Sequence, residues 1–164
     1  YEAINLPVFG PDSSMVAYQS LKEGKWRGVV GERESAANYD GVDAPVFSSD
    51  GARIAYPAIK NGKFFMIVSP IGKPDDVKRS PAYDMAVTPV FSPDGRRIAY
   101  RARKGPMEKA KRFIVIADAD TGKVIKEGPV GDEIWPPVWS ADSKTAAYGA
   151  RIGKELWWKV QALP

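Results

Sequence analysis

The sequence predicts an all-β protein, a β-propeller made of four-stranded antiparallel blades. A twelve-residue pattern recurs four times, and strand and turn signals follow each copy in the same order. No stretch of the 164 residues shows convincing helical periodicity. Self-similarity at a period of about forty residues is the signature of a repeat architecture, and four strands fit a propeller blade. A β-sandwich would not repeat the same residues at the same place in every unit.

The repeated pattern begins with Pro-Val-aromatic and ends with Ala-Tyr. Its clearest copy reads PVFSPDGRRIAY from Pro89, and the other copies begin at Pro7, Pro45 and Pro137. Pro, Asp and Gly at its centre favour a turn, so we interpret its aspartates as turn residues rather than catalytic groups. We also assign a structural role to the tyrosine that ends each copy. These residues are Asp12, Asp50, Asp94 and Asp142, with Tyr18, Tyr56, Tyr100 and Tyr148.

Each copy predicts four strands in order. In the third copy a strand over 89–92 enters the turn at 92–95, and a β-branched, aromatic strand follows over 97–100. A second hairpin comes next, clearest at Asn61-Gly62. The predicted third strands are Trp26–Val30, Phe64–Val68, Phe113–Ala117 and Leu156–Val160. The fourth strand is clearest over 123–126, and 77–80 is its weaker counterpart.

These elements give one domain with blades at about 1–38, 39–82, 83–130 and 131–164. The last unit has no visible outer strand. Four blades are the lower limit for closing a propeller, and unpaired sheet edges are a liability. Three arrangements therefore remain open: a part of a longer propeller, which we favour, a tight closure with a borrowed strand, or two chains that pair.

The composition restricts the chemistry. The chain has no Cys and no His, so the thiolate and imidazole groups of common nucleophilic and zinc sites are missing. We assign no catalytic residue and no cofactor, apart from a calcium-like cation that carboxylates could bind. The net charge is +4, and the densest basic stretch, residues 104–112, is expected to be an exposed loop rather than a nucleic-acid site. No apolar run approaches the ~20 residues that span a bilayer.

An acidic residue stands five positions before each repeat proline. Loops at this place rim one mouth of a propeller channel, so the acids could bind a cation or a basic partner segment. The alternative is a repeated turn in which the carboxylate holds the loop backbone. Trp135 lies in the same loop of the last unit, where it could anchor a partner or simply pack. The four acids are Glu2, Asp40, Asp84 and Asp132.

The repeat resembles the TolB-type, WD-like propeller repeat, P-x-[FW]-S-P-D-G-x-x-[IL]-A-[FY]. The copies from Pro45 and Pro89 match it almost fully, whereas the first copy has Gly10 for Ser and the fourth has Ala141 for Pro. The resemblance implies an exported, periplasmic or extracellular protein that binds a protein or peptide partner without catalysis. It also leaves open the propeller part of a larger prolyl-oligopeptidase-like hydrolase, although no G-x-S-x-G elbow is present. A carboxylate-only glycoside hydrolase is the third alternative.

Overall fold

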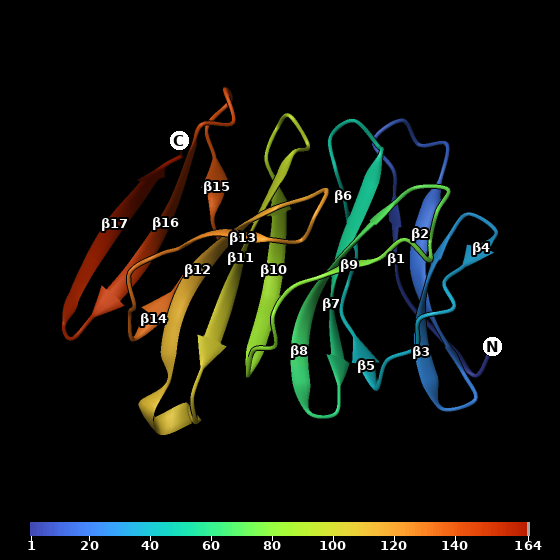
Figure 1. Cartoon of the computed structure of the whole chain (residues 1–164), viewed down its shortest axis with the longest axis horizontal. Helices are drawn as coiled ribbons and strands as arrows, with labels where there is room; N and C mark the ends of the chain where they lie inside the picture. Colours follow the sequence, from blue (N-terminus) through green and yellow to red (C-terminus); the bar gives the residue numbers. More distant parts are fainter. Residues whose placement is uncertain (164) are drawn as a thin grey trace.

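The computed structural model describes residues 1–163, and of Leu6 it describes only the backbone. Four antiparallel sheets stand side by side in sequence order and form an open row (Figure 1). The all-β prediction is confirmed, with a single 3₁₀ turn over Met107–Lys109 in the part of the chain that is described. None of these residues forms a helix of the length and apolar character needed to cross a membrane.

Each sheet is one blade of the predicted propeller. Blade 1 contains β1 (Ala3–Phe9), β2 (Val16–Lys22), β3 (Lys25–Val30) and β4 (Arg33–Glu34). Blade 2 contains β5 (Gly41–Val42), β6 (Val46–Phe47), β7 (Arg53–Lys60), β8 (Lys63–Pro70) and β9 (Lys78–Arg79). Blade 3 contains β10 (Met85–Phe91), β11 (Arg97–Lys104), β12 (Lys111–Asp118) and β13 (Val124–Glu127). Blade 4 contains β14 (Glu133–Ile134), β15 (Val138–Trp139), β16 (Thr145–Ile152) and β17 (Glu155–Ala162).

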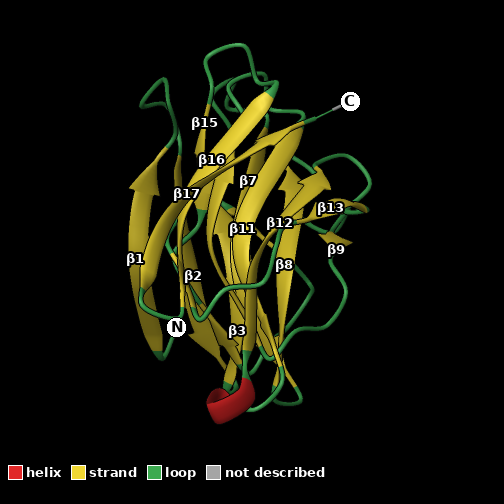
Figure 2. Cartoon of the chain, turned by 90° about the vertical axis from the view of Figure 1, so that its left-hand side faces the viewer, coloured by secondary structure: helices red, strands yellow, loops and turns green. Residues whose placement is uncertain are grey.

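Blade 4 shows no outer strand among residues 131–163, and Pro164, the end of the predicted last unit, lies outside the described residues. Figure 2 views the row from its end. It places β1 on one side of the molecule and the outer strands β9 and β13 on the opposite side.

The first strand of every blade is irregular where the repeat proline lies. The pairing of β1 with β2 shifts register between Asn5 and Val8, and that of β10 with β11 shifts between Val87 and Val90. In blades 2 and 4 the same region is split into two short strands. Proline has no N–H to donate to a ladder, so it occurs in sheets at bulges and edges. The motif therefore bends each first strand at its proline.

Every blade has two faces, because successive side chains of a strand point to opposite sides. We call the face toward the following blade the forward face and the other the back face. The motif alanines lie on forward faces, and Ala17, Ala55 and Ala99 are fully buried against the next blade. The motif tyrosines lie on back faces, where Tyr56, Tyr100 and Tyr148 are also buried. Small residues on one side and rings on the other let neighbouring blades pack closely.

The two ends of the blades carry different connections. The motif turns join the first strand to the second at one end, and the hairpins between second and third strands lie at the other, together with the 3₁₀ turn (Figure 1). The four acids that precede the prolines are at the hairpin end.

Candidate functional site

The motif aspartates lie inside the turns that join first and second strands. In blade 3 the Ser92 hydroxyl donates to Asp94 Oδ1 at 2.6 Å, and the Arg96 N–H donates to the same oxygen at 3.1 Å. Asp50 and Asp142 accept the same two kinds of hydrogen bond in blades 2 and 4. In blade 1 Gly10 replaces the serine, and Asp12 bonds only to Ser14.

These contacts engage the carboxylates with their own turns. The hydrogen bond from Ser48 and that from the Ala52 N–H hold the pKa of Asp50 below its ordinary value of 3.8. This geometry stabilises the charged carboxylate within the turn.

The acids that precede the prolines cap the hairpins at the opposite end. Asp40 accepts from the Asn61 N–H at 2.7 Å and Asp84 from the Gly105 N–H at 2.8 Å. Glu2 and Asp132 do the same in their own blades, with Glu23 and Gly153 as donors.

At two joints the same carboxylate also binds a lysine of the preceding blade. Lys25 contacts Asp40 and Lys63 contacts Asp84, each at 2.5 Å. The hydrogen bond from its lysine is the main reason that the pKa of each of these aspartates is lowered. Among residues 1–163 no three acidic side chains gather closely enough to share a metal ion. The cation site thus stays a sequence prediction, and the geometry places these carboxylates in backbone contacts.

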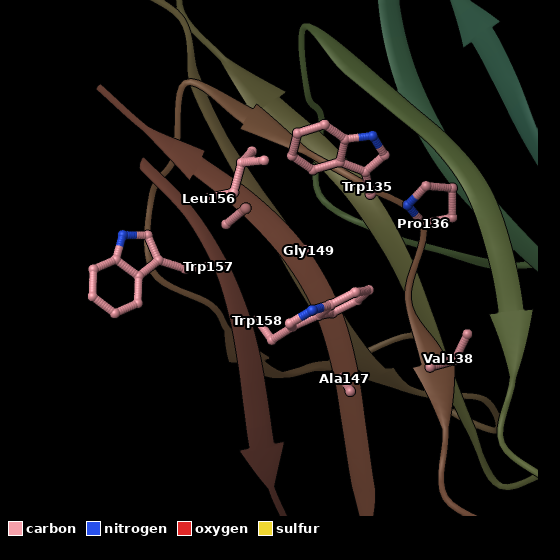
Figure 3. A pocket seen from close by; sticks show the side chains of 9 residues that line it. Trp135, Pro136, Val138, Ala147, Gly149, Leu156, Trp157 and Trp158 are labelled. Atoms are coloured by element: carbon pink, nitrogen blue, oxygen red, sulfur yellow. The ribbon is translucent and has the colours of Figure 1, made fainter. Parts of the chain in front are cut away.

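Trp135 lies between two hollows at the last blade and is 41% exposed. The first hollow, of about 440 Å³, covers the forward face of blade 4 and has an apolar lining. In Figure 3 Leu156 points toward Trp135 and Trp158 lies near Ala147, whereas Trp157 points away from the others. The Trp135 ring lies over Gly149, where an added Cβ would be 3.3 Å from it.

The second hollow lies between blades 3 and 4 and is rich in arginine. It has a volume of about 290 Å³, and Arg101, Arg103 and Arg112 line it together with Met107 and Trp135. Arg101 and Arg103 are two residues apart on β11, and Arg112 is the direct partner of Arg103 on β12. All three side chains therefore project from the forward face of blade 3.

Neutral groups hold the three guanidinium groups. Arg101 donates to the Ile134 carbonyl at 3.1 Å, and Arg112 donates to the Asp132 carbonyl at 2.8 Å. Arg103 donates to the Asp84 carbonyl at 3.1 Å, and its Nε is buried without a hydrogen-bond partner. None of the ion pairs within residues 1–163 involves these arginines. Their charges are therefore free to attract an anion.

Other charges near this hollow do not cancel that excess. Glu133 is the acidic residue in its lining, and its carboxylate accepts from Arg151 at 2.8 Å. That hydrogen bond holds the pKa of Glu133 low, so the group stays charged but is already paired. Burial lowers the pKa of Arg101, yet arginine remains protonated in proteins. The lining thus holds three cationic groups and one paired carboxylate, and the charges of Arg103 and Arg112 also act on Asp84 and Glu133.

Sequence reasoning identified Trp135 but missed the arginines. A signal was present in the repeat, because Arg101 and Arg103 stand where blade 1 has Gln19 and Leu21. A strand that carries Arg-x-Arg on a blade-facing side, where its sibling is neutral, indicates a special role for that joint. For the basic stretch over 104–112 the sequence predicted only an exposed loop.

No protein-family model and no curated protein sequence matches the chain. Solved structures match it in fold. The β-propeller domain of the Trilobed protease from Pyrococcus furiosus superposes with a TM-score of 0.66 at 15% identity, covering 96% of this chain and 53% of that one. An oligogalacturonate lyase in complex with manganese superposes with a TM-score of 0.65 at 13% identity, covering 99% of this chain and 49% of the lyase. A protein described as a putative TolB from Agrobacterium tumefaciens superposes with a TM-score of 0.56 at 17% identity, covering 99% of this chain and 62% of that protein.

These likenesses confirm the β-propeller that the repeat predicted, and a TolB-type propeller is among the structures that share it. The chain spans between 49% and 62% of the length of these three proteins. The same fold occurs in proteins named as a TolB, a protease and a lyase. The site itself, rather than the fold, must therefore carry the argument about function.

Proposed function

We propose that this chain is a non-catalytic propeller that binds a protein partner through an acidic, peptide-like segment. The arginine hollow between blades 3 and 4 carries the proposal. Its three guanidinium groups have neutral hydrogen-bond partners, so a carboxylate that enters gains charge-assisted hydrogen bonds without breaking an ion pair. The net charge of +4 favours the approach of an acidic partner as well.

Trp135 supplies the apolar part of the same site. Trp135 is half-exposed and lines the hollow, and Met107 lines it as well. Tryptophan and arginine are the residue types that most often dominate binding energy at protein interfaces. A segment in which an acidic residue lies next to an apolar one fits both groups at once. The proposal expects an exported location, periplasmic or extracellular, in line with the resemblance to TolB-type repeats.

A labelled peptide tests this site by fluorescence anisotropy. The probe is an eight-residue peptide with glutamates on both sides of one phenylalanine, and its control replaces every glutamate by glutamine. We expect the acidic peptide to bind about tenfold more tightly or better, because a hydrogen bond to a charged group contributes roughly 1.5–3 kcal/mol. The advantage should shrink as salt is added.

Matched variants locate the binding. Arg112→Gln and Trp135→Ala should weaken the acidic peptide, whereas Arg96→Gln should not, since exposed Arg96 lies in the turn at the other end of β11. Equal binding of the two peptides, or an equal loss in Arg96→Gln, would contradict the proposal. Hydrolysis of the probe, measured by mass spectrometry, would instead favour the alternative of an enzyme.

A further inference from the structure

We propose that two copies of this chain associate head to tail, with the forward face of blade 4 in one copy packed on the back face of blade 1 in the other. Both faces are apolar, both are uncovered, and they lie at opposite ends of the row (Figure 1). The two faces lie apart from the three arginines of the hollow and share only Trp135 with its lining, and the inference does not depend on the proposed function.

The forward face of blade 4 has the residues of a blade interface but no blade against it. Val160 pairs with Ala147 in the register that places a valine or isoleucine beside the motif alanine in every other blade. Val160 is 67% exposed, whereas its equivalents are at most 9% exposed. Val138, Leu156 and Trp158 belong to the same face and are 60%, 72% and 80% exposed. Those equivalents of Val160 are Val30, Val68 and Ile116.

The back face of blade 1 is the matching surface. Phe9 is 71% exposed and Tyr1 is 62% exposed, whereas Tyr39, the equivalent of Tyr1 in blade 2, is 4% exposed. Tyr1 packs edge-to-face on Tyr18 with ring centroids 6.5 Å apart, as Tyr39 packs on its own motif tyrosine at 6.2 Å. Blade 1 therefore presents the ring arrangement that blades 2 and 3 bury.

The existing joints show which residues would meet. Val8 and Phe47 belong to the cluster between blades 1 and 2, and Val46 and Phe91 to that between blades 2 and 3. If blade 4 of one copy packs on blade 1 of the second copy in the same way, Val138 lies against Phe9 of the second copy. The same packing also places Ala147 and Val160 against the second copy's Tyr18, as Ala17 and Val30 pack with Tyr56. One chain thus carries both halves of a joint that it already builds three times.

The sequence alone favours a part of a longer propeller, whereas the two matching faces and the number of blades favour a closed pair. A head-to-tail contact either closes into a ring or continues as a filament. Two copies with four blades each would contribute eight, which is the upper end of the usual propeller range of four to eight. Closure would also cover both apolar faces. Large exposed apolar patches are rare on single soluble proteins and usually mark interaction sites.

Glu155 carries a negative charge where blades 1 and 2 have a lysine, and this difference provides a further test of the association. Lys25 and Lys63 begin the third strands of blades 1 and 2, and each pairs with an aspartate of the next blade. Glu155 begins the third strand of blade 4, so the same packing would bring it toward Glu2 of the second copy. Restoring the repeat residue with Glu155→Lys should therefore strengthen association, roughly threefold for an exposed pair.

Sedimentation velocity of the whole chain over a range of concentrations tests the association. We expect the mass of two chains at high concentration. Val160→Asp and Phe9→Asp should each weaken the dimer at least about thirtyfold, because each places a charge in the centre of an apolar contact. Ile125→Asp is the matched control, since Ile125 is an exposed apolar residue on the outer strand β13. It should leave the dimer unchanged.

A single-chain mass at every concentration, in the native chain and in Glu155→Lys, would overturn the proposal and leave other propeller blades as the cover of these faces. An equal loss of association in Ile125→Asp would overturn it too. Peptide binding separates the two proposals, because Phe9 lies in blade 1 and the arginine hollow between blades 3 and 4. Phe9→Asp should abolish the dimer and leave the affinity for the acidic peptide intact.

Discussion

Serine and aspartate of the motif form a small hydrogen-bonded unit in three of the four turns. The buried Ser92 hydroxyl accepts from the Arg97 N–H at 3.0 Å and donates to Asp94. The unit thus supplies a partner for a backbone group that the turn leaves without one. The sequence was sufficient to place these aspartates in turns. It could not reveal the second role of the serine, which depends on a backbone group five residues away.

Replacing this serine should destabilise the fold. Ser92→Ala leaves the Arg97 N–H and the Asp94 carboxylate each short of one hydrogen bond, so we expect a loss of about 1–2 kcal/mol in the free energy of unfolding. Urea denaturation measures it. Ser14→Ala in blade 1 is the control, because that hydroxyl is exposed and its loss should stay within about 0.5 kcal/mol. Equal losses in both variants would contradict this role.

Neighbouring blades approach so closely that some joints require a residue without a side chain. Gly128, after β13, is the clearest example, because an added Cβ would lie 2.4 Å from the Tyr148 hydroxyl oxygen. The tyrosine is buried and cannot move freely, and the Gln161 side chain donates to it at 3.4 Å. The pattern of the repeat does not include Gly128, because the role of this glycine depends on where the next blade places its tyrosine ring.

Gly128→Ala should therefore strain the joint between blades 3 and 4. We expect a loss of about 1–3 kcal/mol in stability, the usual cost of overpacking. The same substitution in a Tyr148→Phe background should cost less than half as much, since the oxygen that it contacts has been removed. Thermal unfolding of the four proteins of this cycle measures the difference. Identical costs in the two backgrounds would show that the clash is not the cause.

The molecule as a whole is an open row in which carboxylates anchor both ends of the blades. Hydrogen bonds from Ser140 and from the Lys144 N–H hold the pKa of Asp142 below its ordinary value, and the pKa values of Asp40, Asp50 and Asp84 are lowered as well. A lowered folded-state pKa contributes stability that is present above the unfolded pKa and is lost as pH falls through the folded one. The chain has no His to titrate near neutrality.

Stability should thus change little between about pH 8 and pH 5 and then fall below about pH 4, where the unfolded carboxylates begin to protonate. Melting temperatures followed by circular dichroism across this range provide the measurement. A marked decrease between pH 7 and pH 5 would contradict the expectation. The Asp50→Asn variant should show a weaker acid dependence than the native chain.

Local signals in the sequence determined the repeat, the strands and the turns. Proline, aspartate and glycine act on their own backbone, and alternation assigns side chains to the two faces of a strand, so these features need no knowledge of distant residues. The same reasoning placed Trp135 in the loop of the last blade. Only the tertiary structure decided which surfaces are left uncovered and which charges are left unpaired. Those properties arise where residues of different blades meet, as Arg101 and Arg112 of blade 3 do with the Ile134 and Asp132 carbonyls of blade 4.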